Sequence, residues 1–447
     1  MSSKRLATNN NQLPEGYKKT EVGVIPEDWE VKYLKQISPS QSVGLVINPS
    51  SYFDEKGTVP SLVGSQISEN HINWEIANRI TEASNESLPA SRLKAGDLVT
   101  VRVGQPGITA VVPPELDGCN CASMMIVRQH PSFNSLWLCY MMNSRLGKAQ
   151  INHVQYGTAQ KQFNISDAID FIYPVPPFPE QKTIAQTLSD VDALIASLDK
   201  LIAKKRNIKT GTMQQLLTGK TRLPGLGEGK GYKKSAIGLI PEDWEVVLLS
   251  KLSHIATGQT PPTKNRNYYG YEYLFVSPAD MGNAKYIINT LKKLSKLGFF
   301  ICRIYPPMSI LFTCIGSTIG KCGIVTSEST SNQQINAIFP SELVNNEYLY
   351  YQLVRSAHRI KSKAGEQAVP IVNKTEFGAT LVLVCSIEEQ KAIAQVLSDI
   401  DTEITALEKR RAKTQAIKQG MMQELLTGRT RLKIEHPDDP ITKNSNG

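Results

Sequence analysis

Residues 180–223 read EQKTIAQTLSDVDALIASLDKLIAKKRNIKTGTMQQLLTGKTRL, and residues 389–432 read EQKAIAQVLSDIDTEITALEKRRAKTQAIKQGMMQELLTGRTRL. The two segments are identical at 27 of 44 positions, without a gap. A second pair lies upstream, with GYKKTEVGVIPEDWEV at 16–31 and GYKKSAIGLIPEDWEV at 231–246, where 12 of 16 positions match. The chain is therefore a tandem duplication in which a repeated frame brackets two middles that differ almost completely. This pattern indicates two different binding domains mounted on one repeated frame.

Each copy of the longer repeat is predicted to form one long helix. Residues 180–217 contain no proline, and their apolar residues recur at steps of 4, 3, 4, 3 and 4, which is the spacing of a coiled-coil seam. Prolines precede the segment, and Gly219 follows it at the position where a helix commonly ends. A helix of this length is a rod of roughly 57 Å. The predicted seam and partner-docking residues are Ile184, Leu188, Val191, Ile195, Leu198 and Ile202 in the first copy and Ile393, Leu397, Ile400, Ile404 and Leu407 in the second.

A single amphipathic helix of this length cannot bury its apolar stripe alone, so we expect the two copies to pack on each other. An antiparallel pair would relate the two units by an approximate twofold axis. A parallel pair would bring both variable middles to one end. In the remaining alternative each helix only covers its own domain, although the repeated length and the shared seam count against it.

The two middles, residues 32–178 and 247–387, are predicted to be mixed domains. Short β-like runs occur at 97–103, 108–112, 310–315 and 380–384, and amphipathic helical stretches follow at 136–151 and 347–360. Strands in series followed by helices favour an α+β fold over a parallel α/β fold.

Loops rich in Gly, Ser, Thr, Asn and Gln recur at matching places in the two middles. Residues 103–108 match 315–320, residues 120–124 match 332–336, and residues 157–161 match 365–369. Such side chains suit hydrogen bonds to phosphates and base edges, although ordinary turns use the same residue types. The loop 256–269 adds basic and aromatic residues that the first middle lacks, so the two middles should bind different sequences. The candidate DNA-binding residues are Gln66, Arg102, Gln105, Asn120, Ser123, Thr158, Gln160, Lys161, Gln259, Thr260, Lys264, Asn265, Arg266, Tyr268, Tyr269, Ser317, Thr318, Lys321, Asn332, Gln333 and Gln334.

Composition gives broad limits on the partner and the compartment. The 447 residues carry a formal net charge of +9, which weakly favours an anionic partner such as nucleic acid. No apolar run is long enough for a membrane helix, and the first ten residues lack the apolar core of a signal peptide. The seven cysteines are scattered and odd in number, which predicts reduced thiols in a cytoplasmic protein.

The motifs of catalysis fail on their spacing. The stretch 316–321 resembles a phosphate-binding loop, but it has three residues between its glycines and is followed by Cys322. The six histidines show no metal-binding spacing, and Cys119 with Cys121 forms only an isolated pair. We therefore expect no catalytic residues and no metal site in this chain.

The order of these segments resembles the specificity subunit of type I restriction-modification systems. The resemblance rests on the Ile-Pro-Glu-Asp-Trp lead-ins, on Pro-Pro-Phe-Pro-Glu-Gln-Lys before the first long helix and on Leu-Leu-Thr-Gly-Lys-Thr-Arg-Leu after it. It also includes Thr-Gly-Gln-Thr-Pro at 257–261 and Ser-Asn-Gln-Gln-Ile-Asn-Ala at 331–337. The resemblance covers about residues 16–432, and the first middle departs from it because it lacks the Thr-Gly-Gln-Thr-Pro loop.

The resemblance implies two target-recognition domains that each read one half of a split DNA sequence, with the helices as the spacer between them. It implies an antiparallel, pseudo-twofold helix pair that docks two methyltransferase subunits for adenine methylation, and motor-nuclease subunits for cleavage of unmodified DNA. The chain itself would need no cofactor, while its partner subunits would use S-adenosylmethionine, ATP and magnesium. The competing hypothesis from the residues is a coiled-coil scaffold whose middles bind proteins.

The predicted domain organisation follows the repeats. It consists of a flexible tail at 1–15, a first target-recognition domain at 16–178, a central helix at 179–222, a linker with the second target-recognition domain at 223–387, a distal helix at 388–432 and a flexible tail at 433–447.

Overall fold

The computed structural model describes residues 13–433 except residues 47, 159, 228, 283 and 366–368, so most of the two predicted tails lies outside the described residues. The chain divides into two compact units. Unit 1 comprises Met1–Leu198 and Arg410–Gly447, and unit 2 comprises Asp199–Lys409. Each unit thus contains one globular domain and part of each long helix.

The globular domain of unit 1 combines short sheets with helices, as the α+β prediction requires. Its central sheet has the strand order β10-β9-β12-β4, and every neighbouring pair is antiparallel. A second sheet, β11-β5-β8, contains the parallel pair β11 and β5. Helix α3 (Ser135–Asn143) packs against β10 and is followed by α4 (Arg145–Val154). The sheet strands are β4 (Gln41–Val43), β5 (Val59–Leu62), β8 (Asn78–Ile80), β9 (Leu98–Val101), β10 (Thr109–Val111), β11 (Asn120–Cys121) and β12 (Met124–Val127).

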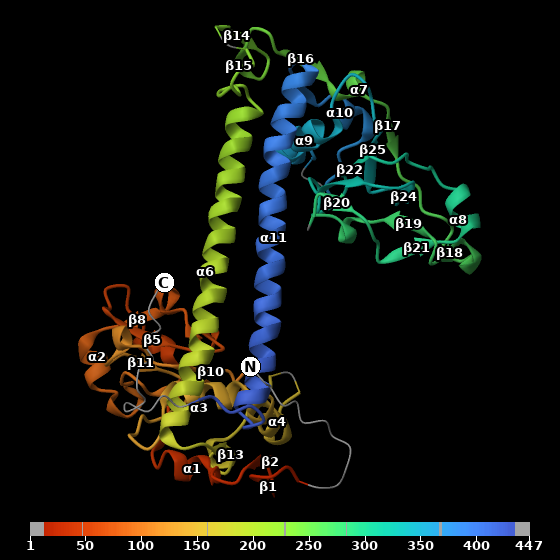
Figure 1. Ribbon diagram of the computed structural model, residues 1–447. Coiled ribbons are helices and arrows are strands. Elements are labelled where there is room, and N and C mark those ends of the chain that lie inside the picture. Colours follow the sequence, from red (N-terminus) through yellow and green to blue (C-terminus); the bar gives the residue numbers. More distant parts are fainter. Residues whose placement is uncertain are drawn as a thin grey trace, which may run out of the picture. The chain divides into compact units, whose positions relative to one another are not determined.

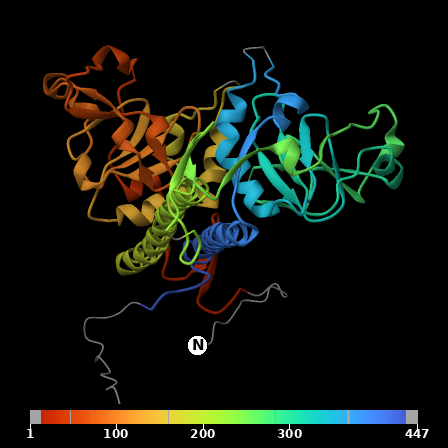
Figure 2. The ribbon, with the colours of Figure 1, turned by 90° about the horizontal axis from the view of Figure 1, so that it is seen from above.

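Unit 2 repeats this plan with a larger central sheet, β17-β25-β22-β23-β20, and a second sheet, β18-β21-β19-β24. Helix α9 (Asn346–Lys361) packs against β23 and β26, and it lies between the central sheet and the long helix α11 (Figures 1 and 2). Its strands are β17 (Ile255–Thr257), β18 (Tyr269–Gly270), β19 (Tyr273–Val276), β20 (Tyr286–Ile287), β21 (Lys292–Leu294), β22 (Ile310–Thr313), β23 (Cys322–Val325), β24 (Ser329–Ser331), β25 (Ile335–Ile338) and β26 (Leu381–Val384).

The repeated segments form the two long helices, α6 (Phe178–Leu216) and α11 (Ile387–Leu425), of 39 residues each. The glycine after each helix has a positive φ, +69° at Gly219 and +68° at Gly428, as a helix-ending glycine requires. Within each unit the beginning of one long helix lies near the end of the other. In unit 1 the Lys418 ammonium lies 2.5 Å from Asp192, and in unit 2 the Lys209 ammonium lies 2.5 Å from Asp401.

Four of the predicted seam residues lie in cores that each globular domain shares with the ends of both long helices, so they are buried and do not form an open docking surface. Ile184 and Leu188 belong to the core of unit 1, and Ile393 and Leu397 belong to the core of unit 2. The first turns of each long helix therefore cover their own domain and also meet the end of the other long helix. Leu198, Ile202 and Ile404 are also buried, whereas Val191, Ile195, Ile400 and Leu407 are half-buried.

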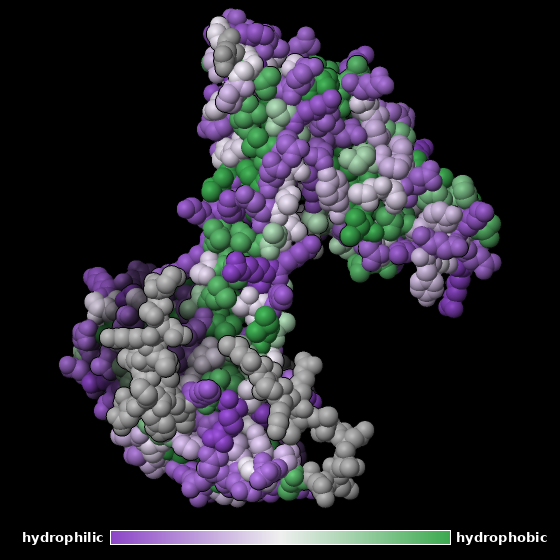
Figure 3. Space-filling model, in the orientation of Figure 1, coloured by the Kyte–Doolittle hydropathy of each residue, from purple (hydrophilic) through white to green (hydrophobic). Residues whose placement is uncertain are grey.

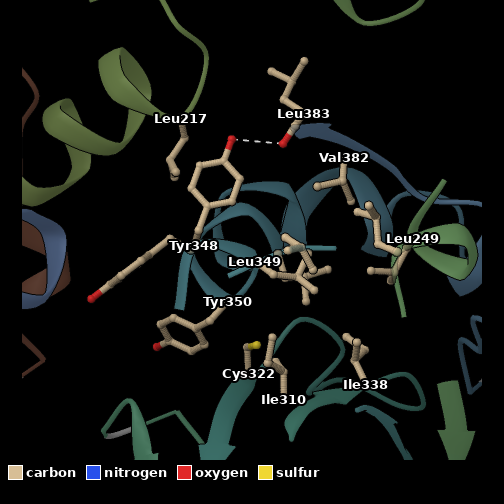
Figure 4. Packing of buried hydrophobic residues seen from close by; sticks show 14 of the residues in the cluster. Leu217, Leu249, Ile310, Cys322, Ile338, Tyr348, Leu349, Tyr350, Val382 and Leu383 are labelled. Carbon is tan, nitrogen blue, oxygen red and sulfur yellow. Dashed lines mark hydrogen bonds between the residues drawn. The ribbon is translucent and has the colours of Figure 1, made fainter. Parts of the chain in front are cut away.

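The core of unit 2 gathers the globular domain and the ends of both long helices. Leu217 follows α6, Ile393 belongs to α11, and both join the side chains of the central sheet and α9 in one buried cluster. Figure 4 shows part of this cluster, in which the Tyr348 hydroxyl donates to the Leu383 carbonyl at 3.0 Å. The corresponding core of unit 1 contains Met422, Leu425 and Leu426 from the end of α11.

A group of four side chains, which we call the helix-end clamp, holds the end of α11 in unit 1. The Trp29 indole N–H donates to Glu180 at 3.0 Å. Arg431 donates to both carboxylate oxygens of Asp28 at 2.9 Å and to both of Glu180 at 2.5 and 2.7 Å. Glu180 is only 1 % exposed, so the guanidinium supplies the charge partner that a buried carboxylate requires.

The same clamp recurs in unit 2, where it holds the end of α6. Trp244 donates to Glu389 at 3.0 Å, and Arg222 donates to Asp243 at 2.9 Å and to Glu389 at 2.5 and 2.7 Å. The hydrogen bond from Arg222 lowers the pKa of Asp243 to about 2. Each lead-in segment therefore binds the end of the long helix that belongs to the other copy of the repeat. This contact explains why both segments of the frame are repeated.

The glutamine that follows the clamp glutamate fixes the globular domain to the start of its helix. In unit 1 the Gln181 carbonyl oxygen accepts from the backbone N–H of Asn134, which is the N-cap of α3, at 2.9 Å. In unit 2 the Gln390 carbonyl oxygen accepts from the backbone N–H of Asn345, the N-cap of α9, at 2.7 Å. The repeated Glu-Gln pair is thus a structural element of the frame.

Candidate nucleic-acid interface

In unit 1, three of the predicted polar residues meet in one cleft of about 690 Å³. Gln105 comes from the loop after β9, Ser123 from the turn between β11 and β12, and Gln160 from the loop after α4. All three side chains are exposed. The cleft therefore presents two amides and a hydroxyl, groups that can both donate and accept hydrogen bonds at base edges.

Backbone contacts hold these loops together. The Gly104 N–H donates to the Lys161 carbonyl at 2.9 Å, and Val103 forms an antiparallel bridge with Gln162. Ser123 has a φ of +57°, a conformation that few residues other than glycine adopt. The turn leaves the Ser123 side chain exposed at the cleft.

The equivalent loops also converge in unit 2. The Gly316 N–H donates to the Pro370 carbonyl at 2.9 Å, which joins the loop after β22 to the one before α10 (Lys374–Gly378). The Thr260 hydroxyl donates to the Gln333 side chain at 2.5 Å, which joins the loop after β17 to the β24–β25 turn. In that turn the Asn332 amide donates to the Gln334 side chain at 2.9 Å. Polar side chains from loops far apart in the sequence thus form one surface.

Unit 2 adds cations to its loop cluster. Lys264 and Arg266 are exposed in the loop that leads into β18. Two further cations were not among the predicted residues: Arg303 donates to the Thr257 carbonyl at 3.0 Å, and Lys361 donates to the Ser317 carbonyl at 3.3 Å. Figure 3 shows the region of β18, β21 and α8 (Lys296–Phe300) as hydrophilic residues interspersed with hydrophobic ones. Lys361 ends α9 and is therefore far in sequence from the loop that it contacts.

Two predicted DNA-binding residues are buried, which corrects their assignment. Asn120 is 1 % exposed, and its amide donates to Asn85 at 3.0 Å and to the Leu88 carbonyl at 3.2 Å. Gln66 is 7 % exposed and accepts from the backbone N–H of Val63 at 2.7 Å. Both side chains stabilise the domain and cannot reach DNA in this conformation.

The predicted match between Asn120 and Asn332 is also corrected by the strand pairing. Asn120 lies in β11 and pairs with Ser61, whereas Asn332 follows β24, whose Ser331 pairs with Val276. The two asparagines therefore occupy different positions, one within a strand and the other in a turn.

Several other predicted residues contact the protein's own loops. The Arg102 guanidinium donates to the Phe163 carbonyl at 3.3 Å, and the Lys321 ammonium donates to the Pro278 carbonyl at 3.0 Å. The Tyr269 hydroxyl donates to the Pro261 carbonyl at 2.9 Å, and Asn265 caps the short helical turn that contains Tyr268. These four residues shape the loops, whereas Thr158, Lys161, Gln259 and Ser317 are exposed and Thr318 is half-buried.

The described residues contain no group of three or more His, Cys, Asp or Glu side chains that could hold a metal ion, and no described helix is long and apolar enough to span a membrane. All seven cysteines are buried. Burial raises the pKa of the Cys119, Cys314 and Cys385 thiols to about 12, so these thiols stay protonated at neutral pH.

Comparison with known proteins gives a consistent result over almost the whole chain. The model of the type I restriction-modification DNA specificity domain matches residues 26–205 and again residues 241–419. The chain is 30% identical over 436 residues to the putative type I restriction enzyme MjaX specificity subunit of Methanocaldococcus jannaschii, covering 94% of this chain and 97% of the relative. It is 26% identical over 445 residues to the MjaVIII specificity subunit of the same organism, covering 92% of this chain and 94% of that relative.

Solved structures share the fold. The S subunit of a type I restriction-modification system from M. genitalium matches with a TM-score of 0.56 and 14% identity, over 89% of this chain and 96% of the other. A chain from a structure that addresses complex assembly and conformational transition of the type I R-M system matches with a TM-score of 0.54 and 18% identity, over 91% and 99%.

Proposed function

Because the chain belongs to the type I restriction-modification DNA specificity family and is a specificity subunit with two target-recognition domains, we propose that each domain reads one half of a bipartite DNA sequence. The subunit is a DNA-recognition component and not an enzyme. The observation that carries the proposal is the repeated convergence of exposed amide, hydroxyl and cationic side chains on the loops of each globular domain.

The proposed roles of the loop side chains in DNA binding follow from their chemistry. Lysine and arginine side chains supply salt-dependent contacts to phosphates, while amides and arginines read base edges in the major groove. Unit 1 offers Gln105, Ser123 and Gln160, whereas unit 2 adds Lys264 and Arg266 beside its amides. The two half-sites should therefore differ in sequence.

The long helices are proposed to pair along their length as an antiparallel coiled coil that sets the distance between the half-sites. Ion pairs between the helices within each unit support this pairing, including Arg206 with Glu408 at 2.6 Å in unit 2. A helix of 39 residues is about 58 Å long, and half-sites one DNA turn apart lie about 34 Å from centre to centre. The rod is thus long enough to hold two domains at that separation.

The proposed partners act on the DNA that this subunit selects. Two methyltransferase subunits dock on the helix pair and methylate adenines with S-adenosylmethionine, and motor-nuclease subunits cleave unmodified DNA with ATP and magnesium. These cofactors belong to the partner subunits. The complex acts in the prokaryotic cytoplasm, where the chromosome and invading DNA meet.

The proposal is tested by single-molecule sequencing of host DNA with and without the gene for this chain. We expect one methylated motif with two unlike halves and a fixed gap to disappear when the gene is removed. A purified complex with a methyltransferase subunit should restore the motif on unmethylated DNA. If this complex left DNA unmodified, the proposed function would be wrong.

A further inference from the structure

A three-residue cluster of tyrosine, aspartate and lysine recurs in both units, at the place where the globular domain meets the two long helices. In unit 1 the Tyr140 hydroxyl of α3 donates to Asp192 of α6 at 2.8 Å, and the Lys418 ammonium of α11 lies 2.5 Å from the same carboxylate. The Lys418 ammonium also lies 5.4 Å from the centre of the Tyr140 ring. Each side chain comes from a different element, so the cluster joins the domain to both helices.

Unit 2 repeats the cluster with the helices exchanged. The Tyr351 hydroxyl of α9 donates to Asp401 of α11 at 2.7 Å, and the Lys209 ammonium of α6 lies 2.5 Å from Asp401. The Lys209 ammonium lies 5.5 Å from the centre of the Tyr351 ring. The same geometry in domains with different sequences indicates that the frame requires it.

Burial strengthens the hydrogen bonds from the two cluster tyrosines to their aspartates. Tyr140 is 2 % exposed and Tyr351 is fully buried, and each hydroxyl uses its aspartate as the hydrogen-bond acceptor. The burial and the neighbouring carboxylate both raise the tyrosine pKa, which keeps each hydroxyl protonated as a donor. A hydrogen bond to a charged group at a half-buried site is stronger than one at the surface.

Each domain contacts its long helix over two stretches, the first turns and the cluster. The first turns carry the clamp glutamate, Glu180 or Glu389, and the cluster aspartate lies twelve residues beyond it at Asp192 or Asp401. Twelve residues of helix span about 18 Å. A domain attached only at the first turns of the helix can tilt about them, whereas a further attachment this far along the helix fixes its angle.

We propose that the two Tyr–Asp–Lys clusters are positioning residues that set the angle of each target-recognition domain on the long helices, and thereby the number of base pairs accepted between the half-sites. The inference rests on the proposed function, because it assumes that both domains bind one DNA molecule. A domain free to tilt can reach half-sites that are one base pair nearer or further. A domain held by its cluster cannot.

Unit 2 has an additional cation at its cluster. Lys285, which directly precedes β20, donates to Ser398 of α11 at 2.8 Å and to the Tyr351 hydroxyl at 3.4 Å, and its side chain is only 7% exposed. Its ammonium also lies 3.3 Å from Glu347. Loss of Lys418 should therefore loosen the domain of unit 1 more than loss of Lys209 loosens the domain of unit 2.

The test uses the full-length chain in complex with its methyltransferase subunit. Initial methylation rates are measured on DNA with the native gap and with gaps one base pair shorter and longer, for the wild type, Tyr140→Phe and Tyr351→Phe. We expect the preference for the native gap to fall on the order of tenfold in each variant, the factor that corresponds to about 1.4 kcal/mol, the scale of one such hydrogen bond. Lys418→Met should lower the preference more than Lys209→Met.

Tyr348→Phe is the matched control, because it removes a hydroxyl from the same helix as Tyr351. The Tyr348 hydroxyl donates to the Leu383 carbonyl at 3.0 Å and accepts from Gln352 at 2.7 Å, so its partners lie within the domain. The control should keep its preference for the native gap even where its melting temperature falls.

The possible outcomes distinguish a failure of the positioning role from a failure of the proposed function. If the tyrosine variants and Lys418→Met all methylate DNA with an unchanged gap preference, the positioning role is wrong. If a tyrosine variant fails to fold, Lys418→Met and Lys209→Met still decide the question, because they retain the buried ring contacts. If the wild-type complex methylates no bipartite sequence, the proposed function itself fails.

Discussion

At the scale of residues, the repeated frame consists of side chains that meet across long stretches of sequence. Trp29 and Glu180 are 151 positions apart, and Glu180 and Arg431 are 251 positions apart. The sequence shows that these residue types recur, but it cannot show that they contact one another. The buried glutamate explains the recurrence, because a carboxylate without water needs a cation and hydrogen-bond donors at fixed positions.

Replacement of Arg222 by methionine should strongly destabilise unit 2. The substitution leaves Glu389, which is 1 % exposed, without its cation, and removal of one partner of a buried ion pair costs about 3–5 kcal/mol. The loss is measured as a lower free energy of unfolding, and as faster hydrogen exchange at the end of α6. Arg206→Met is the matched control, because the Arg206 and Glu408 side chains are 63% and 41% exposed and such a pair contributes less than about 1 kcal/mol. Equal effects of the two variants would contradict the role of the clamp.

At the scale of elements, the sequence predicted the long helices closely but not all of their neighbours. The observed helices, Phe178–Leu216 and Ile387–Leu425, begin within a few residues of the predicted starts. Apolar spacing identifies a helix face that must be buried, but it does not identify what buries it. Ile184 and Leu188 therefore fit the seam pattern and yet pack in a globular core. Likewise, Asn120 and Gln66 have the residue types of a DNA-binding loop but satisfy buried backbone groups instead.

Insertion of four residues into both long helices should widen the recognised gap by one or two base pairs. Insertions after Leu198 and after Lys409 fall at the boundaries of the two units, so the contacts within each unit are kept. Four residues lengthen a helix by about 6 Å and turn it about 40° beyond a full turn. One DNA base pair adds about 3.4 Å and about 34° in the same direction. Sequencing of methylated DNA measures the gap, and an unchanged gap would contradict the proposal that the helices act as a spacer.

Insertion of seven residues at the same two positions is the control for phase. It lengthens each helix by about 10 Å, the length of about three base pairs, but returns the helix to within about 20° of its starting orientation. Three base pairs rotate DNA by about 100°, so one domain would face the wrong side of the duplex. This variant should methylate weakly at every gap length, although it folds and binds its partners.

At the scale of the whole molecule, each lead-in contacts the segment that follows a long helix, in unit 1 as in unit 2. In unit 2 the Tyr232 hydroxyl donates to the Gly219 carbonyl at 3.1 Å, so residues 220–231 join two segments that contact each other. In unit 1 the Tyr17 hydroxyl donates to the Gly428 carbonyl at 2.9 Å, so the same two segments meet there without a covalent link. Each unit therefore has the same local structure whether or not the chain connects its lead-in to the helix end.

A circular permutant should therefore recognise the same DNA sequence as the natural chain. The permutant begins at residue 231, runs to residue 432, continues through a copy of the linker Pro-Gly-Leu-Gly-Glu-Gly-Lys from 224–230, and ends with residues 16–223. The copied linker spans the same contact in unit 1 that the original spans in unit 2, so both clamps form without strain. Methylation in complex with the methyltransferase subunit should show the wild-type motif at a similar rate.

A second permutant opened between residues 198 and 199 cuts α6 in its middle, and it should lose methylation because the continuous helix is broken. If the first permutant lost the motif while the second kept it, the helix-end clamps would not be the contacts that close the frame.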